Sequence, residues 1–143
     1  FPGSATGEEL GWRGFALPRL QARRSALTAS LIVGAVWGTY HFPLFLLGSP
    51  VRPFALFLPF ALSCTIMSIF YTWMYNGTGG SLLIAVLLHA ATNLPLTIVM
   101  GPLEEQVLPS YWIYVALLAV AAAGLIARTG AATLSRSGVK QIA

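Results

Sequence analysis

Three pairs of residues, each pair four positions apart, are the part of this sequence best suited to chemistry. With one extra carboxylate beside the first pair, the members are Glu8, Glu9, Arg13, Trp37, His41, His89 and Asn93. A carboxylate or an imidazole can take a proton from water, and imidazole and amide donors can stabilise an oxyanion. If helices bring these side chains together, they suffice for hydrolysis by an activated water.

The first pair lies in the segment GEELGWRGF, residues 7–15. On a helix, Glu9 and Arg13 share a face and can form an ion pair, while Glu8 is rotated by about a third of a turn and points elsewhere. One carboxylate held by a guanidinium and one left available would serve as a support and a general base. A capped helix start with a surface ion pair explains the same spacing equally well.

The first histidine occurs in WGTYHFP, residues 37–43. Gly34, Gly38 and His41 follow one helical stripe, whose small residues allow a neighbouring helix to approach closely. We therefore expect His41 to point into a helix bundle, with Pro43 loosening the backbone beside it. Taken alone, this motif is better explained by a hydrogen-bonded core histidine than by a catalytic one.

The second histidine occurs in LHAATN, residues 88–93, where His89 and Asn93 would present an imidazole and a carboxamide side by side. Two such donors aimed at one point could hold an oxyanion. Hydrogen bonding between membrane helices explains them as well. Ionisable groups within membrane spans are costly, so their concentration in these three pairs favours a functional role.

The elements that must position these residues are membrane-spanning helices. Of the 143 residues, 57% are hydrophobic and only 8% are charged, against about 25% in soluble proteins. Long stretches without Asp, Glu, Lys or Arg match the roughly 20 apolar residues that a helix needs to cross the hydrocarbon core. Because unpaired backbone amides are too costly in lipid, each stretch should be helical. Spans are predicted near residues 26–47, 54–75, 81–100 and 111–127.

The predicted fold is therefore an all-α, polytopic transmembrane bundle of about four spans, forming a single domain over residues 1–143. A short helix over residues 7–22, capped by Ser4 or Thr6 and kinked or ended by Pro18, precedes the spans. The sequence does not begin with Met and shows no signal peptide, so we expect it to belong to a larger bundle with earlier spans.

Basic residues lie at the ends of the spans, although the net charge is +4. Four crossings return the chain to its starting side, where all the basic residues outside the first motif except Arg52 would lie. By the positive-inside rule this side is predicted to be cytoplasmic, together with a basic and loosely ordered tail at residues 128–143. The pattern argues against nucleic-acid binding. The single Cys64 within a span argues against a disulfide framework or a thiolate metal site.

With these boundaries the two histidines would not lie at the same depth. His41 would lie about 22 Å into its span and His89 about 12 Å into its own, at 1.5 Å per residue. For the rings to meet, the helices must be offset or tilted, or the boundaries must be wrong. We expect the boundaries to be wrong.

The order EExxxR, aromatic-xxxH and HxxxN resembles the three motifs of the CAAX protease and bacteriocin-processing family, which includes the type II CAAX prenyl endopeptidases. The matching residues are Glu8, Glu9 and Arg13, then Trp37 and His41, then His89 and Asn93. The words GEELGWRGFALPRLQ and WGTYHFP also look like bacterial members of the family. The resemblance runs from residue 7 to about residue 100, and it implies an intramembrane endopeptidase in a bacterial cell membrane.

The resemblance also implies a role for each motif residue. Glu8 would activate the attacking water together with His41. His89 and Asn93 would hold the oxyanion, and the ion pair of the first motif would orient the site. The partners it implies are a peptide or protein substrate and the lipid bilayer.

The sequence leaves the need for a metal open. Two histidines and a glutamate could supply three ligands to a catalytic zinc ion with one open position. No HExxH motif is present on a single helix, however. A metal-free water activated by Glu8 and His41 would use the same residues.

Two other functions remain possible on this pattern. A non-catalytic member of the same family, such as a bacteriocin-immunity or scaffold protein, would keep the helices and tolerate the loss of Glu8. A proton-coupled transporter would use His41 and His89 as a proton site. The transporter leaves Asn93 and the two glutamates without a role.

Overall fold

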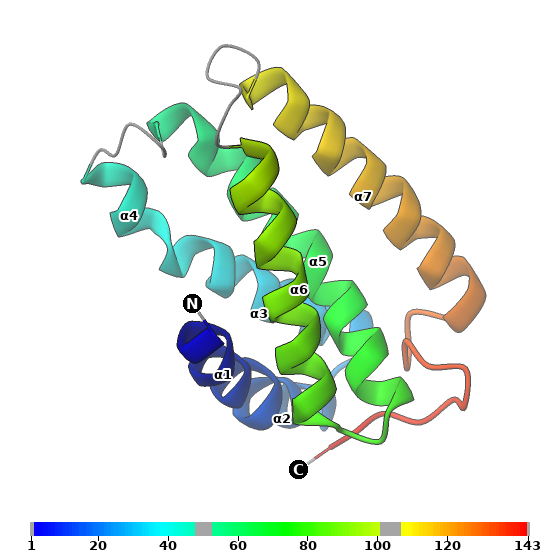
Figure 1. The fold of residues 1–143 in the computed structure, drawn as a ribbon. Coiled ribbons are helices and arrows are strands. Elements are labelled where there is room, and N and C mark those ends of the chain that lie inside the picture. The colour runs from blue at the N-terminus through cyan, green and yellow to red at the C-terminus, as the bar shows by residue number, and fades with distance from the viewer. Residues whose placement is uncertain (1, 48–52, 101–106, 143) are drawn as a thin grey trace.

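The computed structural model of this chain is built from helices (Figure 1) and describes residues 2–47, 53–100 and 107–142, with side chains described in these ranges except at 2–4, 94–100 and 107. In chain order the elements are α1 (Pro2–Gly11), a π-helical turn (Trp12–Ala16), α2 (Leu17–Gln21), α3 (Ala26–Tyr40), α4 (Phe42–Leu46), a 3-10 turn (Phe54–Leu56), α5 (Phe57–Gly77), α6 (Leu82–Met100) and α7 (Val107–Thr129). No strand occurs in the ranges described. The all-α prediction is confirmed.

Three of the four predicted spans are helices long and apolar enough to cross a membrane: Ala26–Leu46, Phe54–Gly77 and Leu108–Thr129. The last begins earlier and ends later than predicted. The third predicted span, 81–100, corresponds to α6, whose part with described side chains, Leu82–Asn93, is apolar but shorter than a span. The chain is thus an integral membrane protein with three candidate spans among its described residues, and a crossing by α6 stays a prediction.

The segment before the spans is one helical rod, α1 to α2, with a π-helical turn in its middle. The Leu17 N–H bonds to the Trp12 carbonyl five residues back, which is the π pattern. A wider turn here avoids the clash that the Pro18 ring would make with the preceding helical turn. The predicted start at a Ser4 or Thr6 cap is wrong, because the helix already begins at Pro2. Both glutamates therefore lie beyond its first turn.

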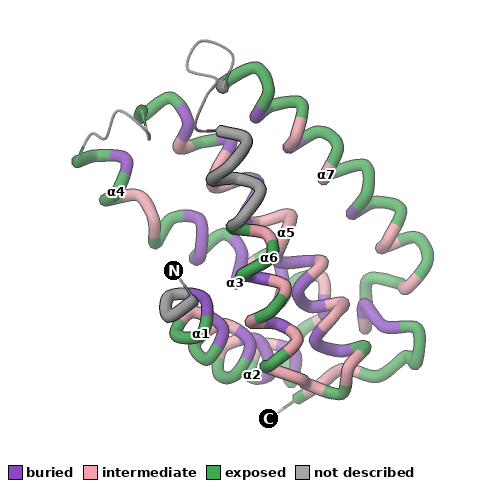
Figure 2. The backbone as a smooth tube through the Cα atoms, in the orientation of Figure 1, coloured by how far each residue is buried: buried purple, intermediate pink, exposed green. Residues whose placement is uncertain are grey.

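Helix α5 is the centre of the bundle and packs most closely against α3 (Figure 2). The two glycines of the predicted stripe face it. A Cβ at Gly34 would lie 2.6 Å from the Cα of Thr65, and a Cβ at Gly38 would lie 2.8 Å from the Cα of Ala61. The predicted close approach at these glycines is confirmed.

The first span breaks at His41. Helix α3 ends at Tyr40, and the His41 N–H bonds to the Gly38 carbonyl three residues back at 3.3 Å. Helix α4 follows, with Pro43 in its first turn, where a missing N–H costs nothing. The predicted loosening beside Pro43 is confirmed, and it places the histidine at the junction of two helices.

Residues 130–142 are not a loose tail, so that prediction is wrong. The carbonyls of Ala131 and Ala132 accept hydrogen bonds from the first N–H groups of α3, at 3.0 and 2.9 Å. Leu134 is fully buried. The carbonyl of Gln141 accepts a hydrogen bond from the Gln21 side chain at 2.8 Å. The segment is held because its carbonyls satisfy the first N–H groups of α3 and because Leu134 is buried in the core.

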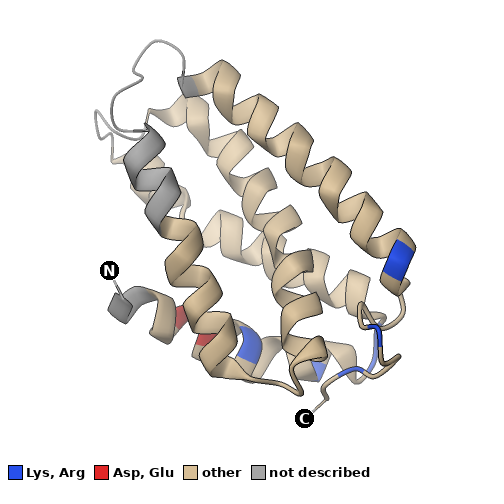
Figure 3. Cartoon of the chain, turned by 45° about the vertical axis from the view of Figure 1, so that its right-hand side comes forward, with Lys and Arg blue, Asp and Glu red and all other residues tan. Residues whose placement is uncertain are grey.

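Charge is confined to one end of the described structure, as Figure 3 shows. The acidic and basic residues there belong to the α1–α2 rod, the turn after it, the end of α7 and the C-terminal segment. Arg52, predicted to lie on the opposite side, falls outside the described residues.

Candidate active site

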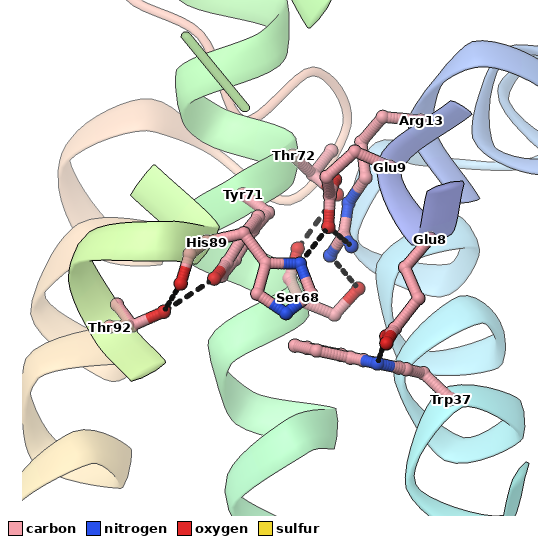
Figure 4. Close-up of polar contacts among 9 residues, drawn as sticks. All are labelled: Glu8, Glu9, Arg13, Trp37, Ser68, Tyr71, Thr72, His89 and Thr92. Atoms are coloured by element: carbon pink, nitrogen blue, oxygen red, sulfur yellow. Dashed lines mark hydrogen bonds and ion pairs between the residues drawn. The ribbon is translucent and has the colours of Figure 1, made fainter. Parts of the chain in front are cut away.

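Glu9 is the anchor of the site. Its side chain is completely buried, and its Oε1 accepts hydrogen bonds from Arg13 Nη1 at 2.9 Å and from His89 Nδ1 at 2.8 Å (Figure 4). An ionised carboxylate can only accept, so His89 carries a proton on Nδ1. The pair of Glu9 and Arg13 predicted from their spacing is therefore present, and a residue 80 positions away joins it.

The Arg13 guanidinium is held through both terminal nitrogens and by two aromatic rings. Its Nη2 donates to Ser68 Oγ at 3.2 Å, and its Cζ lies 4.3 Å from the centre of the Tyr71 ring and 5.3 Å from that of Trp37. Burial lowers the pKa of Arg13 from its ordinary value, and the neighbouring Glu9 carboxylate opposes that shift. A buried ion pair is stable only while both partners are present, so Glu9 is committed to Arg13.

Glu8 has a different environment from its neighbour. Its side chain is only partly buried, and its Oε2 accepts a hydrogen bond from Trp37 Nε1 at 2.6 Å. An indole N–H is neutral, so this bond orients the carboxylate without neutralising its charge. Figure 4 shows the two glutamates leaving α1 in different directions, as their positions on a helix predict.

His41 is oriented by its own helix. Its Nδ1 lies 2.9 Å from the Trp37 carbonyl, which can only accept, so Nδ1 carries the proton and Nε2 of the neutral ring is an acceptor. The ring is partly exposed and packs edge-on against Tyr40 and Phe60, at centroid distances of 5.4 and 5.1 Å. This tautomer is the one that a water-activating base requires.

Trp37 contacts one residue from each of the three motifs. It donates to Glu8, its carbonyl accepts from His41, and its ring centre lies 5.2 Å from that of His89. The two histidines therefore converge on one residue although their helices enter at different depths. The span starts, Ala26 and Leu82, lie within one residue of the prediction. The expected boundary error is wrong. Figure 1 shows α3 and α6 running obliquely to each other, and both histidine rings pack edge-on against Trp37.

Asn93 lies one turn after His89 on α6, and its side chain is exposed. His89 itself is buried and committed through Nδ1 to Glu9. Any oxyanion contact from His89 must therefore come from Nε2. The predicted role of this pair stays a prediction.

Ser68, Tyr71 and Thr92 belong to the site, although their motif-free positions did not predict it. Ser68 Oγ accepts a hydrogen bond from Arg13, and Thr92 Oγ1 donates one to the His89 carbonyl. The Tyr71 ring packs against Arg13 and His89. The signal was the spacing of Ser68, Tyr71 and Thr72, which places three polar groups on one face of a span.

These side chains do not fit a zinc site. Among the described residues, no group of three His, Cys, Asp or Glu side chains is placed to hold a metal ion. Glu9 Oε2 is buried and has no hydrogen-bond partner among the described residues, but a cation there would lie beside the guanidinium that binds the other oxygen. Repulsion between the two positive charges opposes such a ligand.

The fold and this cluster define a class of protein: a helical membrane protein with a carboxylate, imidazole and guanidinium site packed among its helices. The family model of Rce1-like type II CAAX prenyl endopeptidases matches residues 1–95, a segment that contains all six predicted site residues. The chain belongs to this family. Among curated proteins, it is 38% identical over 98 residues to CAAX prenyl protease 2 of Methanococcus maripaludis, covering 64% of this chain and 36% of that relative. The chain thus spans about a third of the relative's length. No solved structure matches it.

Proposed function

We propose that this chain supplies the active site of an intramembrane endopeptidase that hydrolyses a peptide bond with an activated water. The observation that carries the proposal is the opposite environment of the two adjacent glutamates. Glu9 is buried and bound by Arg13 and His89. Glu8 is partly exposed and bound by a neutral indole N–H. A carboxylate that acts as a general base must be free of a cationic partner, oriented and reachable by water, and Glu8 meets these conditions in the described structure.

In the proposed reaction, Glu8 and the Nε2 atom of His41 bind the attacking water, and Glu8 takes its proton as the oxygen attacks the scissile carbonyl. Glu8 then returns this proton to the leaving amine. No step uses a metal ion.

The oxyanion of the tetrahedral intermediate would be held by His89 Nε2 and the Asn93 amide. Because Nδ1 of His89 donates to Glu9, Nε2 can also donate only from the cationic ring. The Glu9 carboxylate, 2.8 Å from Nδ1, fixes the direction in which Nε2 points. Glu9 thus supports the intermediate without contacting it.

The name of the curated relative suggests the substrate to test first, a peptide with a prenylated cysteine in a C-terminal CAAX sequence. Basic residues gather at the end of the bundle that carries the C-terminal segment (Figure 3). By the positive-inside rule we assign this end to the cytoplasmic side of the cell membrane.

The proposal is tested by Glu8→Gln in the full-length protein, reconstituted in liposomes and assayed with a fluorogenic prenylated CAAX peptide. Glutamine keeps an acceptor for Trp37 but cannot take a proton at neutral pH. We expect kcat to fall by roughly 10²-fold to 10⁴-fold. Glu104→Gln, the same chemical change outside the motifs, should keep wild-type activity. Full cleavage by Glu8→Gln would remove the proposed base and favour a non-catalytic or transport function.

A further inference from the structure

Tyr71 of α5 contacts all three side chains that hold the two glutamates. Its ring lies under the Arg13 guanidinium at 4.3 Å. It also packs edge-on against Trp37 and His89, at centroid distances of 5.7 and 5.9 Å. The residue is fully buried. One ring therefore limits the movement of the groups that orient Glu8 and Glu9.

The Tyr71 hydroxyl has a second role in the geometry. It lies 2.7 Å from Thr92 Oγ1, and Thr92 Oγ1 donates its own proton to the His89 carbonyl at 3.0 Å. Since a threonine hydroxyl has one proton, Tyr71 is the donor to Thr92. The result is a relay from Tyr71 through Thr92 to the backbone of His89, as Figure 4 shows.

We propose that Tyr71 is a positioning residue of this site, with its ring fixing Arg13 and its hydroxyl fixing the height of α6 through Thr92. The inference rests on the proposed function. No residue of the three motifs lies on α5. In the described structure, Ser68 is the α5 residue that hydrogen bonds to a motif side chain, Arg13. Tyr71 adds the second connection between α5 and the motif helices, through its ring and through Thr92.

The relay matters because one hydrogen bond, from Nδ1 to Glu9, aligns the His89 ring in the part of the chain that the structure describes. A shift of α6 along its axis would move Nδ1 away from Glu9 and Nε2 away from the substrate. Misplacement by about 1 Å can cost on the order of 10²-fold in rate. Loss of the Tyr71 hydroxyl should therefore affect turnover while leaving the substrate-binding surface intact.

The experiment compares three variants of the full-length protein in liposomes with the prenylated CAAX peptide. Tyr71→Phe keeps the ring and removes the hydroxyl, and we expect kcat to fall about tenfold with KM unchanged, the effect of one buried hydrogen bond. Thr92→Val removes the acceptor and should cause the same fall. The double variant should fall no further, because both changes break one relay. Thr92→Ser keeps a hydroxyl and should retain wild-type kcat.

Tyr111→Phe is the matched control. Tyr111 is a buried tyrosine whose hydroxyl lies 3.3 Å from Ser63 Oγ, between α7 and α5. Loss of the Tyr111 hydroxyl should lower the unfolding temperature as much as Tyr71→Phe does, yet leave kcat unchanged. If kcat of Tyr111→Phe fell as far as that of Tyr71→Phe, the effect would be one of general stability, and the inference would be overturned.

Wild-type kcat in both Tyr71→Phe and Thr92→Val, or full additivity in the double variant, would also overturn it. If Tyr71→Phe fails to fold, the test rests on Thr92→Val and Thr92→Ser, at a position that is only partly buried. Glu8→Gln is measured beside them. Its inactivity together with unaffected relay variants would reject the positioning role alone, whereas an active Glu8→Gln would reject the proposed function.

Discussion

Two adjacent residues of one type show how environment divides roles at the residue scale. Glu9 is withdrawn from solvent and bound by a guanidinium and an imidazole, whereas Glu8 is partly exposed beside an indole. The helical spacing predicted that the two would point apart and that Glu9 would pair with Arg13. It could not predict His89 as the third member, because that contact depends on how α6 packs against α1.

The cluster predicts activity without a bound metal. Among the described residues no three His, Cys, Asp or Glu side chains are placed to share a metal ion, and Arg13 lies where a cation beside Glu9 would lie. We expect the reconstituted protein to keep its cleavage rate after treatment with 1,10-phenanthroline or EDTA, while a zinc protease treated in parallel loses its activity. A loss that added zinc restores would contradict this prediction.

At the scale of elements, two irregularities were partly visible in the sequence. Pro43 predicted the weak backbone beside His41, and Pro18 predicted a disturbance of the first helix. Pro18 is compatible with either a kink or the end of a helix, so the π-helical turn that accommodates its ring could not be predicted, although the helix continues to Gln21 within the predicted range 7–22. The role of α5 was hidden because its polar residues are of types that often bond to their own helix.

The glycine stripe of α3 should be intolerant of even one methyl group. The Cβ of Gly34→Ala would lie 2.6 Å from the Cα of Thr65 and 2.9 Å from its carbonyl oxygen, so α3 and α5 must separate. We expect a loss of about 1–3 kcal/mol in stability, measured as thermal unfolding in detergent. Gly124→Ala on α7 is the control, since its Cβ meets no atom within 4 Å, and it should be neutral or stabilising. Equal stability of the two variants would contradict the close approach.

At the scale of the whole molecule, the C-terminal segment joins elements that are far apart in the sequence. The side-chain amides of Gln21 and Asn76 bond to each other in both directions, at 3.1 and 2.7 Å. The Asn76 amide also donates to the Thr133 carbonyl, and its oxygen accepts from the Gln141 N–H. The composition of the segment predicted a loose tail. The bonds that hold it use backbone carbonyl and N–H groups, which are the same in every sequence, so composition does not reveal them.

Lys140 completes this connection and offers a test of it. Its Nζ donates to the carbonyls of Gln21 and Arg24, at 2.7 and 2.9 Å, at the end of the first rod. Lys140→Met should lower the free energy of unfolding by about 1 kcal/mol and make the tail more sensitive to trypsin. Arg136→Met removes an exposed positive charge from the same segment and should have little effect on stability. Similar behaviour of both variants would show that the tail is not held through Lys140.

The most direct test of the account measures turnover and thermal unfolding on the same samples of Glu8→Gln and Glu9→Gln. We expect Glu8→Gln to unfold near the wild-type temperature and to cleave the peptide roughly 10²-fold to 10⁴-fold more slowly. Glu9→Gln should lose roughly 3–5 kcal/mol of stability, because Arg13 is left as a buried charge without its partner. A stable Glu9→Gln, or a Glu8→Gln that cleaves at the wild-type rate, would contradict the division of roles between the two carboxylates.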